Sequence, residues 1–165
     1  MTAEPEPPAT EDDRRFMRRA IALMHRSLDD PTLGPFGAVV VKDGVVIGEG
    51  SNRVIRDGDP TAHAEIVAIR RAAARLGSHD LSGTVLYASA ECCPMCLAAA
   101  YWARIGALHH ASRCSDYADL FADAGIHDEV RRPPGERRLV SRELLRQEAL
   151  AVWRQFRSRS VRARY

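Results

Sequence analysis

The chain has 165 residues, of which 45% are hydrophobic and 28% charged, and its formal net charge is +2. These values predict a folded domain with its own core and exclude a chain that is disordered throughout. The small net charge is no argument for nucleic-acid binding. No apolar run approaches the length of a membrane span and the N-terminus has no apolar signal region, so we expect a cytoplasmic protein without a membrane segment.

The first 12 residues are rich in proline and acid, and we expect a disordered tail there, followed by a single domain at residues 13–165. A helical pattern opens at Asp12 and Asp13 and places apolar side chains on one face. These side chains are Phe16, Ala20, Leu23, Met24 and Leu28.

Two β-branched runs, at residues 38–41 and 45–50, surround a Lys-Asp-Gly turn and predict a β-hairpin. Asn52 lies just past the second strand. Its side chain can reach into a cleft there, or it can serve as a turn residue that bonds its own backbone.

Residues 61–76 repeat apolar side chains at helical spacing, and Gly77 ends that pattern. His63 and Glu65 fall in the first turn of this helix, near the positive end of its dipole. A buried strand is predicted at residues 84–90, and Pro94 is well placed to start a third helix.

The rest of the chain alternates between strand and helix patterns. We expect a strand at 107–112, weak helical character at 114–130, a possible fifth strand near 138–140 and a helix at about 142–156.

Two short motifs carry the chemistry: His63-Ala64-Glu65 and, 28 residues after Glu65, Cys93-Pro94-Met95-Cys96. One imidazole and two thiols suit Zn²⁺ in a catalytic site with an open fourth position, and an H-x-E motif followed by C-x-x-C is typical of zinc-dependent nucleobase deaminases. Glu65 is then placed to move protons rather than to bind the metal. Backbone amides near Ala64, at the helix start, could bond a carbonyl of the base.

Other interpretations of the cysteines are a redox-active C-x-x-C and a structural zinc site. The redox motif needs no His-x-Glu partner. A structural site needs a fourth protein ligand, which Cys92 or Cys114 could supply.

With these residues in place, the chain resembles the cytidine deaminase superfamily over residues 14–165, and within it the bacterial guanine deaminases. The broader resemblance rests on GPFGAVVVKDG (34–44), DPTAHAE (59–65) and CPMCLAAAYWAR (93–104). The narrower one rests on Phe-x-Asp at 121–123, Pro-x-Glu-Arg at 134–137, Trp-Arg-x-Phe at 153–156 and the terminal Tyr165.

The resemblance implies a three-layer α/β/α domain with a five-stranded mixed sheet, and a homodimer with a swapped C-terminal segment. It also implies a role for each of several residues: zinc on His63, Cys93 and Cys96, Glu65 as general acid/base, Asn52 holding the base, Asp123 binding the base and shuttling protons, Phe36 lining the pocket, and Tyr165 covering the partner's site.

Two positions depart from the family pattern. Cys92 stands where the family usually has a proline, and the family's Asp-Asp pair is Ala122-Asp123, with one residue deleted upstream. The second departure bears on the preference for guanine and leaves zinc-dependent deamination unaffected.

Four functions compete on this evidence. The first is hydrolytic deamination of guanine. The others are deamination of another base or nucleoside such as cytosine or guanosine, a tRNA adenosine deaminase whose C-terminal arginines grip phosphates, and a non-catalytic zinc scaffold. The segment after residue 112 resembles guanine deaminases more than tRNA deaminases, which favours guanine and a small-molecule substrate over nucleic acid. A scaffold leaves Glu65 without a role.

Overall fold

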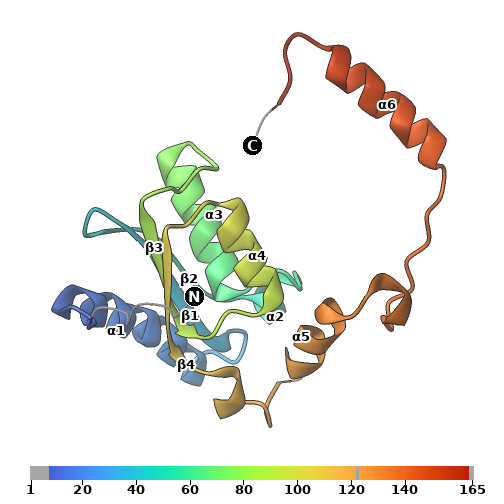
Figure 1. Cartoon of the computed structure of the whole chain (residues 1–165). Coiled ribbons are helices and arrows are strands. Elements are labelled where there is room, and N and C mark those ends of the chain that lie inside the picture. The colour runs from blue at the N-terminus through green and yellow to red at the C-terminus, as the bar shows by residue number, and fades with distance from the viewer. Residues whose placement is uncertain (1–7, 122, 164–165) are drawn as a thin grey trace. The chain divides into compact units, whose positions relative to one another are not determined.

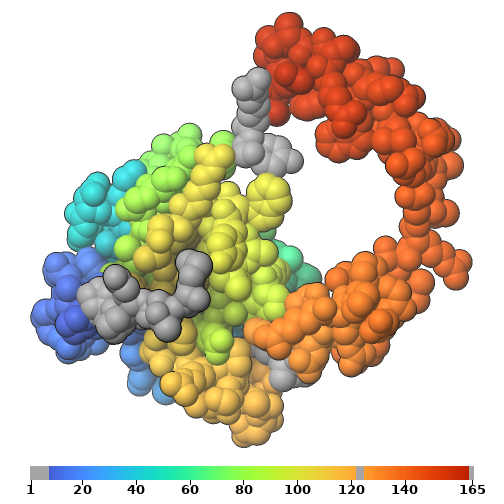
Figure 2. All heavy atoms as spheres, in the orientation of Figure 1, coloured from blue at the N-terminus to red at the C-terminus, as the bar shows by residue number. Residues whose placement is uncertain are grey.

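The computed structural model describes residues 8–121 and 123–163, and the remaining residues are grey in Figure 2. The chain divides into two compact units, Met1–Ala124 and Gly125–Tyr165. Among the described residues, no helix is both long and apolar enough to cross a membrane.

The N-terminal unit is built on a four-stranded sheet with the order β2-β1-β3-β4 (Figure 1). Its strands are β1 (Gly34–Lys42), β2 (Val45–Asn52), β3 (Thr84–Ala90) and β4 (Ala107–Ser112). Strand β1 pairs antiparallel with both β2 and β3, while β3 and β4 are parallel. The predicted mixed sheet is therefore confirmed.

The predicted fifth strand is wrong, because residues 138–140 join no sheet among the described residues. The Arg138 N–H donates instead to the Glu129 carboxylate, 2.8 Å away. Leu139 and Val140 are 82% and 73% exposed, so the apolar pair that suggested a buried strand packs against nothing in its own unit. A three-residue apolar pattern is too short to specify a partner strand.

The two faces of the sheet carry separate cores because successive side chains of a strand point to opposite sides. On one face Val39 and Tyr87 pack with Phe16 of helix α1 (Glu11–His25). On the other face Val40 and Leu86 pack with helices α3 (Ala64–Leu76) and α4 (Pro94–Trp102). The result is the expected three-layer α/β/α arrangement (Figure 1).

Helix α1 starts inside the segment predicted as a tail. Thr10 is its N-cap and forms a capping box with Asp13, in which each side chain bonds the other residue's backbone N–H. This cap explains why the helix begins at Glu11, and a 3₁₀ turn at Arg26–Leu28 follows it.

Helix α3 lies very close to strand β2 because two glycines leave room for it. A Cβ added to Gly48 would lie 2.3 Å from the Ala68 carbonyl oxygen, and one added to Gly50 would lie 2.3 Å from that of Ala64. Such distances are shorter than real contacts, so both glycines are required for the packing of α3.

Helix α4 ends at Trp102, because Arg104 adopts a left-handed φ of 57° that turns the chain into β4. The remaining elements are short helices and the C-terminal helices. They are α2 (Val54–Asp57), a 3₁₀ turn at Cys114–Asp116, α5 (Asp123–Arg131), a 3₁₀ turn at Pro134–Glu136 and α6 (Arg146–Ser158).

The topology brings one set of strand ends together. Strands β2 and β3 both run antiparallel to β1, so they are parallel to each other and end at the same edge of the sheet. The helices that follow them, α3 and α4, therefore begin at that edge. Strand β1 starts there and β4 ends there, so four segments distant in sequence meet at one place.

Candidate active site

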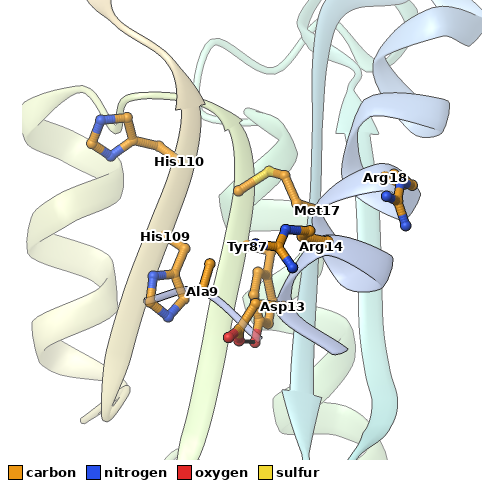
Figure 3. A pocket seen from close by; sticks show the side chains of 8 residues that line it. All are labelled: Ala9, Asp13, Arg14, Met17, Arg18, Tyr87, His109 and His110. Atoms are coloured by element: carbon orange, nitrogen blue, oxygen red, sulfur yellow. Dashed lines mark hydrogen bonds between the residues drawn. The ribbon is translucent and has the colours of Figure 1, made fainter. Parts of the chain in front are cut away.

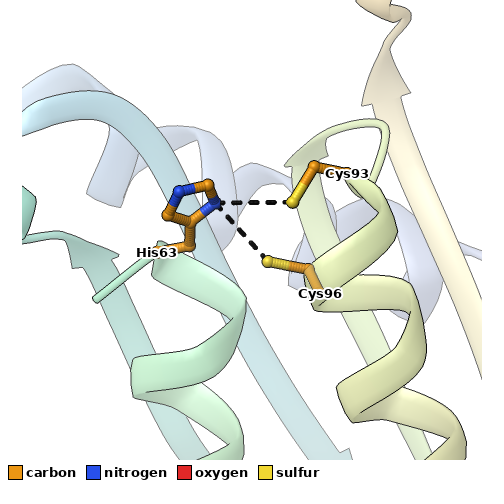
Figure 4. Close-up of side chains that lie close together, drawn as sticks. All are labelled: His63, Cys93 and Cys96. Atoms are coloured by element: carbon orange, nitrogen blue, oxygen red, sulfur yellow. Dashed lines mark hydrogen bonds between the residues drawn. The ribbon is translucent and has the colours of Figure 1, made fainter. Parts of the chain in front are cut away.

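His63, Cys93 and Cys96 meet where α3 and α4 begin, and their side chains point toward one another (Figure 4). His63 is the N-cap residue of α3, Cys93 is the N-cap of α4, and Cys96 lies in the first turn of α4. Each of the two sulfurs is 3.6 Å from Nδ1 of His63. The three predicted ligands are thus adjacent, with one donor atom of each within 4.8 Å of the others.

These spacings fit a zinc ion. Zn–S bonds of about 2.3 Å and Zn–N bonds of about 2.0–2.1 Å, at a roughly tetrahedral angle, put the sulfur and nitrogen about 3.6 Å apart. Cys92 and Cys114 are described by the structure and do not join the group. Three protein donors leave a fourth position open, which is typical of catalytic zinc and argues against a structural site.

The pKa values of the two thiols are shifted in opposite directions, and the lowered one favours a thiolate that can bind a cation. A hydrogen bond from Cys96, together with one from His63, lowers the pKa of Cys93 to about 4. The same bond, together with burial, raises the pKa of Cys96. Burial raises the pKa of Cys92, which keeps that neighbouring thiol protonated and a poor metal ligand.

Glu65 is buried beside this group, with 6% of its surface exposed. Burial raises the pKa of its carboxyl group and the nearby Cys93 adds to the rise, while a bond from its own backbone N–H and the His63 ring act in the opposite direction. Burial therefore favours the protonated form of this carboxyl more than solvent exposure would, which suits a group that both accepts and donates protons.

Three further predicted residues lie at the same edge of the sheet. Phe36 is half-buried at the start of β1, and Asn52 is the last residue of β2, 9% exposed. The Asn52 Oδ1 accepts a hydrogen bond from the Val54 N–H at 3.1 Å. Ala64, the first residue of α3, is fully buried. Like the other N–H groups of a first helical turn, its N–H has no acceptor within the helix.

Two aromatic residues beside Phe36 were not assigned a role from the sequence. The ring centroids of Tyr117 and Phe121 lie 5.4 and 5.3 Å from that of Phe36. Both residues follow β4, which ends at this edge because it is parallel to β3. The signal that could have found them is the position of aromatic residues just after a parallel strand.

Two predicted residues are not tested by the structure. Asp123 is the first residue of α5, and the structure describes its backbone but not its side chain. Tyr165 lies outside the described residues. Both assignments stay predictions.

A groove of about 380 Å³ lies on the opposite face of the sheet, between α1, β3 and β4 (Figure 3). Its polar groups are engaged with one another: the Tyr87 hydroxyl donates to Asp13 at 2.6 Å, and the Tyr87 ring lies 5.3 Å from that of His109. Arg18 is paired with Glu11 at 2.8 Å. The Tyr87–Asp13 hydrogen bond joins α1 to the sheet, the Tyr87–His109 contact links β3 to β4, and the Arg18–Glu11 pair lies within α1.

Comparison with known proteins agrees with this geometry. Residues 10–111 match the family model of the cytidine and deoxycytidylate deaminase zinc-binding region. A guanine deaminase of Bacillus subtilis is 43% identical over 145 residues, which cover 86% of this chain and 93% of that protein. Its crystal structure superposes with a TM-score of 0.88 over 92% of this chain and 98% of that one.

More distant relatives separate into two groups. The guanine deaminase of Nitrosomonas europaea is 30% identical and matches 92% of this chain and 87% of its own, with a TM-score of 0.63. A tRNA-specific adenosine deaminase of Agrobacterium fabrum is 47% identical, but the match covers 59% of this chain and 64% of that protein. The similarity to guanine deaminases thus extends over more of the chain. From its sequence match and its His-Cys-Cys group, the chain belongs to the cytidine and deoxycytidylate deaminase family and is a zinc-dependent deaminase.

Proposed function

We propose that this protein hydrolyses guanine to xanthine and ammonia. The observation that carries the proposal is the similarity to a guanine deaminase over nearly the whole length of both chains. The open, three-donor group at the sheet edge supports it independently, because hydrolytic deamination needs a metal position that a water can occupy.

The proposed zinc ligands are Nδ1 of His63 and the thiolates of Cys93 and Cys96. A zinc ion held there would supply a water whose pKa is lowered toward neutrality. The chain contributes the geometry: two helix N-termini hold the donors in place, and the low pKa of Cys93 makes one thiolate available at neutral pH.

Glu65 is the proposed general acid/base. Its carboxylate takes one proton from the attacking water and passes it to a ring nitrogen of guanine, and then takes the second proton from the added hydroxyl group and passes it to the departing amine. A C–O bond forms at C2, the C–N bond to the exocyclic amine breaks, and ammonia leaves. The raised pKa of the buried Glu65 suits this sequence, because one group must both accept and donate protons at one pH.

The base is proposed to lie against Phe36, with Tyr117 and Phe121 forming the rest of an aromatic wall. Since the Asn52 Oδ1 is occupied by the Val54 N–H, the carboxamide offers its NH₂ group, and we propose that it donates to an acceptor atom of the base. We also propose that the N–H of Ala64, at the positive end of α3, donates to a carbonyl of the base.

The homodimer is part of the same proposal. Helix α4 keeps large apolar side chains on its outer face, with Leu97, Tyr101 and Trp102 exposed by 44%, 78% and 69%. A helix that is apolar all round usually has partners on both sides. In this dimer Asp123 and the partner's Tyr165 would complete the base site, and sedimentation should give twice the monomer mass.

The cellular setting follows from the thiols. Cys92, Cys93 and Cys96 are not in disulfides, and such a cluster persists in a reducing compartment. We therefore propose a cytoplasmic location. The similarity to guanine deaminases over most of the chain supports a small-molecule substrate rather than nucleic acid.

The test is release of ammonia by the zinc-loaded protein from guanine, guanosine, cytosine and adenine, each assayed separately, with Glu65→Ala as the blank. We expect release from guanine. Release from another compound alone would keep the zinc site and Glu65 but contradict the substrate. If none of the four released ammonia, and the protein bound tRNA in a salt-dependent way in a gel-shift assay at low protein concentration, an RNA substrate would be favoured.

A further inference from the structure

Asn52 is held against the neighbouring strand at a point where that strand has no side chain. Gly34 and Asn52 face each other across the β1–β2 pair. A Cβ added to Gly34 would lie 2.9 Å from both Cγ and Oδ1 of Asn52, and 3.2 Å from its Cβ. Real Cβ atoms essentially never lie within 3.0 Å of another heavy atom, so Cγ and Oδ1 of Asn52 occupy the space that a side chain at position 34 would fill.

A shift in the β1–β2 register separates the Gly34–Asn52 pair from the rest of the ladder. Gly34 pairs with Asn52 and Gly37 with the adjacent Ser51, so Pro35 and Phe36 bulge out of the ladder. A bulge of this kind re-aims side chains and is common next to active sites. It presents Phe36 and Asn52 at the same edge as the metal-ligand group.

The contact also fixes which end of the carboxamide is available. Oδ1 accepts the Val54 N–H, and that donor requires an oxygen, so the amide orientation is set by chemistry. No fully enclosed side-chain nitrogen or oxygen of the described residues lacks a hydrogen-bond partner, and Nδ2 of Asn52 forms no hydrogen bond with any described residue. The NH₂ group therefore reaches solvent.

We infer that Gly34 is a positioning residue for base recognition: its missing side chain allows the Asn52 carboxamide to lie over β1 with its NH₂ group directed at the substrate. This inference rests on the proposed function, in which Asn52 donates to an acceptor of the base. The backbone of Gly34 is not left-handed, so conformational freedom is not the reason for a glycine here.

The atoms that obstruct a new Cβ distinguish Gly34 from the structural glycines. At Gly48 they are backbone atoms of α3, the carbonyl oxygen of Ala68 at 2.3 Å and the nitrogen of Ala72 at 2.7 Å, and these cannot move without shifting the helix. At Gly34 they belong to one side chain, which can rotate. Alanine at position 34 should therefore displace Asn52 while the fold persists.

The experiment is a double-mutant cycle of Gly34→Ala and Asn52→Ala in the zinc-loaded protein, with Gly48→Ala for comparison. It measures kcat and KM for guanine, the dissociation constant of 8-azaguanine by calorimetry, zinc content and melting temperature. We expect each single variant at the pair to raise KM and the 8-azaguanine dissociation constant about five- to 50-fold, as for one lost hydrogen bond to a ligand. The change in kcat should stay below about threefold, because the bond is made in both ground and transition states.

The double variant should bind guanine and 8-azaguanine no more weakly than Asn52→Ala alone, because Gly34 acts through Asn52. Zinc content should be unchanged, and the melting temperature of Gly34→Ala should fall by no more than about 5 °C, whereas Gly48→Ala should lose more than about 10 °C. The inference would be overturned if the two single-variant increases in the dissociation constant multiplied in the double variant. It would also be overturned if Gly34→Ala bound 8-azaguanine like wild type, or if it lost zinc or lost as much stability as Gly48→Ala.

Failure of the proposed function gives a different pattern. A wild-type protein that binds 8-azaguanine and shows this cycle, but releases no ammonia from guanine, would refute the guanine activity and support the positioning role. Absence of 8-azaguanine binding by the zinc-loaded wild type would overturn the positioning role as stated.

Discussion

Two carboxylates occupy the first turns of two helices on opposite faces of the same sheet, and their surroundings differ. Asp13 of α1 is half-exposed and accepts hydrogen bonds from Thr10 and Tyr87, with the Tyr87 hydroxyl at 2.6 Å. Glu65 of α3 is buried beside two thiols and an imidazole. Hydrogen bonds from Thr10, then Tyr87, lower the pKa of Asp13 to about 2, whereas burial raises the pKa of Glu65.

The difference shows how environment rather than residue type assigns a role. A carboxylate whose charge is stabilised by donors stays ionised and holds elements together. A carboxylate deprived of water, with a metal-ligand group beside it, is poised to change its protonation state. Each acid also interacts with a histidine, Glu65 with His63 and Asp13 with His109, so matched variants can separate the two environments.

The largest expected effect comes from His63→Ala. Removing one of three donors should abolish stoichiometric zinc binding and reduce activity to background, because two thiolates alone do not hold the ion in place. Metal analysis after dialysis, together with ammonia release, measures this. His109→Ala, on the other face, should keep both zinc and activity, and a zinc-free but active His63→Ala protein would refute the ligand assignment.

Glu65→Ala should come next, with retained zinc and a kcat lowered by about 10²–10⁴-fold, the usual contribution of general acid/base catalysis. Steady-state rates on zinc-matched samples make the comparison. Asp13→Ala is its control, since an acid that only joins helix to sheet should leave kcat unchanged. Near-normal turnover by zinc-loaded Glu65→Ala would end its assignment as the proton carrier.

Asp13→Ala should have the smallest effect, confined to stability. It removes the capping box and the Tyr87 contact, and should lower the free energy of unfolding by about 1–2 kcal/mol at pH 7. Because the folded-state pKa of Asp13 lies below its ordinary 3.8, this stabilisation is present above that value and is lost as the pH falls through about 2.

Denaturant unfolding of wild type and Asp13→Ala at pH 7 and at decreasing pH tests the sign of this dependence. Asp12→Ala, in the same turn with an exposed ion pair to Arg15 at 3.1 Å, should change stability far less. A difference between wild type and Asp13→Ala that grows on acidification would contradict the hydrogen-bonding account.

The sequence by itself determined the chemistry of the centre, because metal ligation depends on residue type and on local spacing. His63-Ala64-Glu65 and the C-x-x-C motif predicted the donor set, and helix-start signals placed both motifs at helix N-termini. The hairpin at residues 38–50 and the buried strand at 84–90 were also predictable from the sequence, since β-branched runs and turn residues are local signals.

Only the tertiary structure decided what depends on contacts between distant segments. It left residues 138–140 outside the sheet, where a short apolar pair had suggested a strand. It brought Tyr117 and Phe121 to Phe36, and it showed that Gly34 makes room for the Asn52 carboxamide. The physical reason is that strand order and register, which no local pattern encodes, determine which side chains share an edge of the sheet.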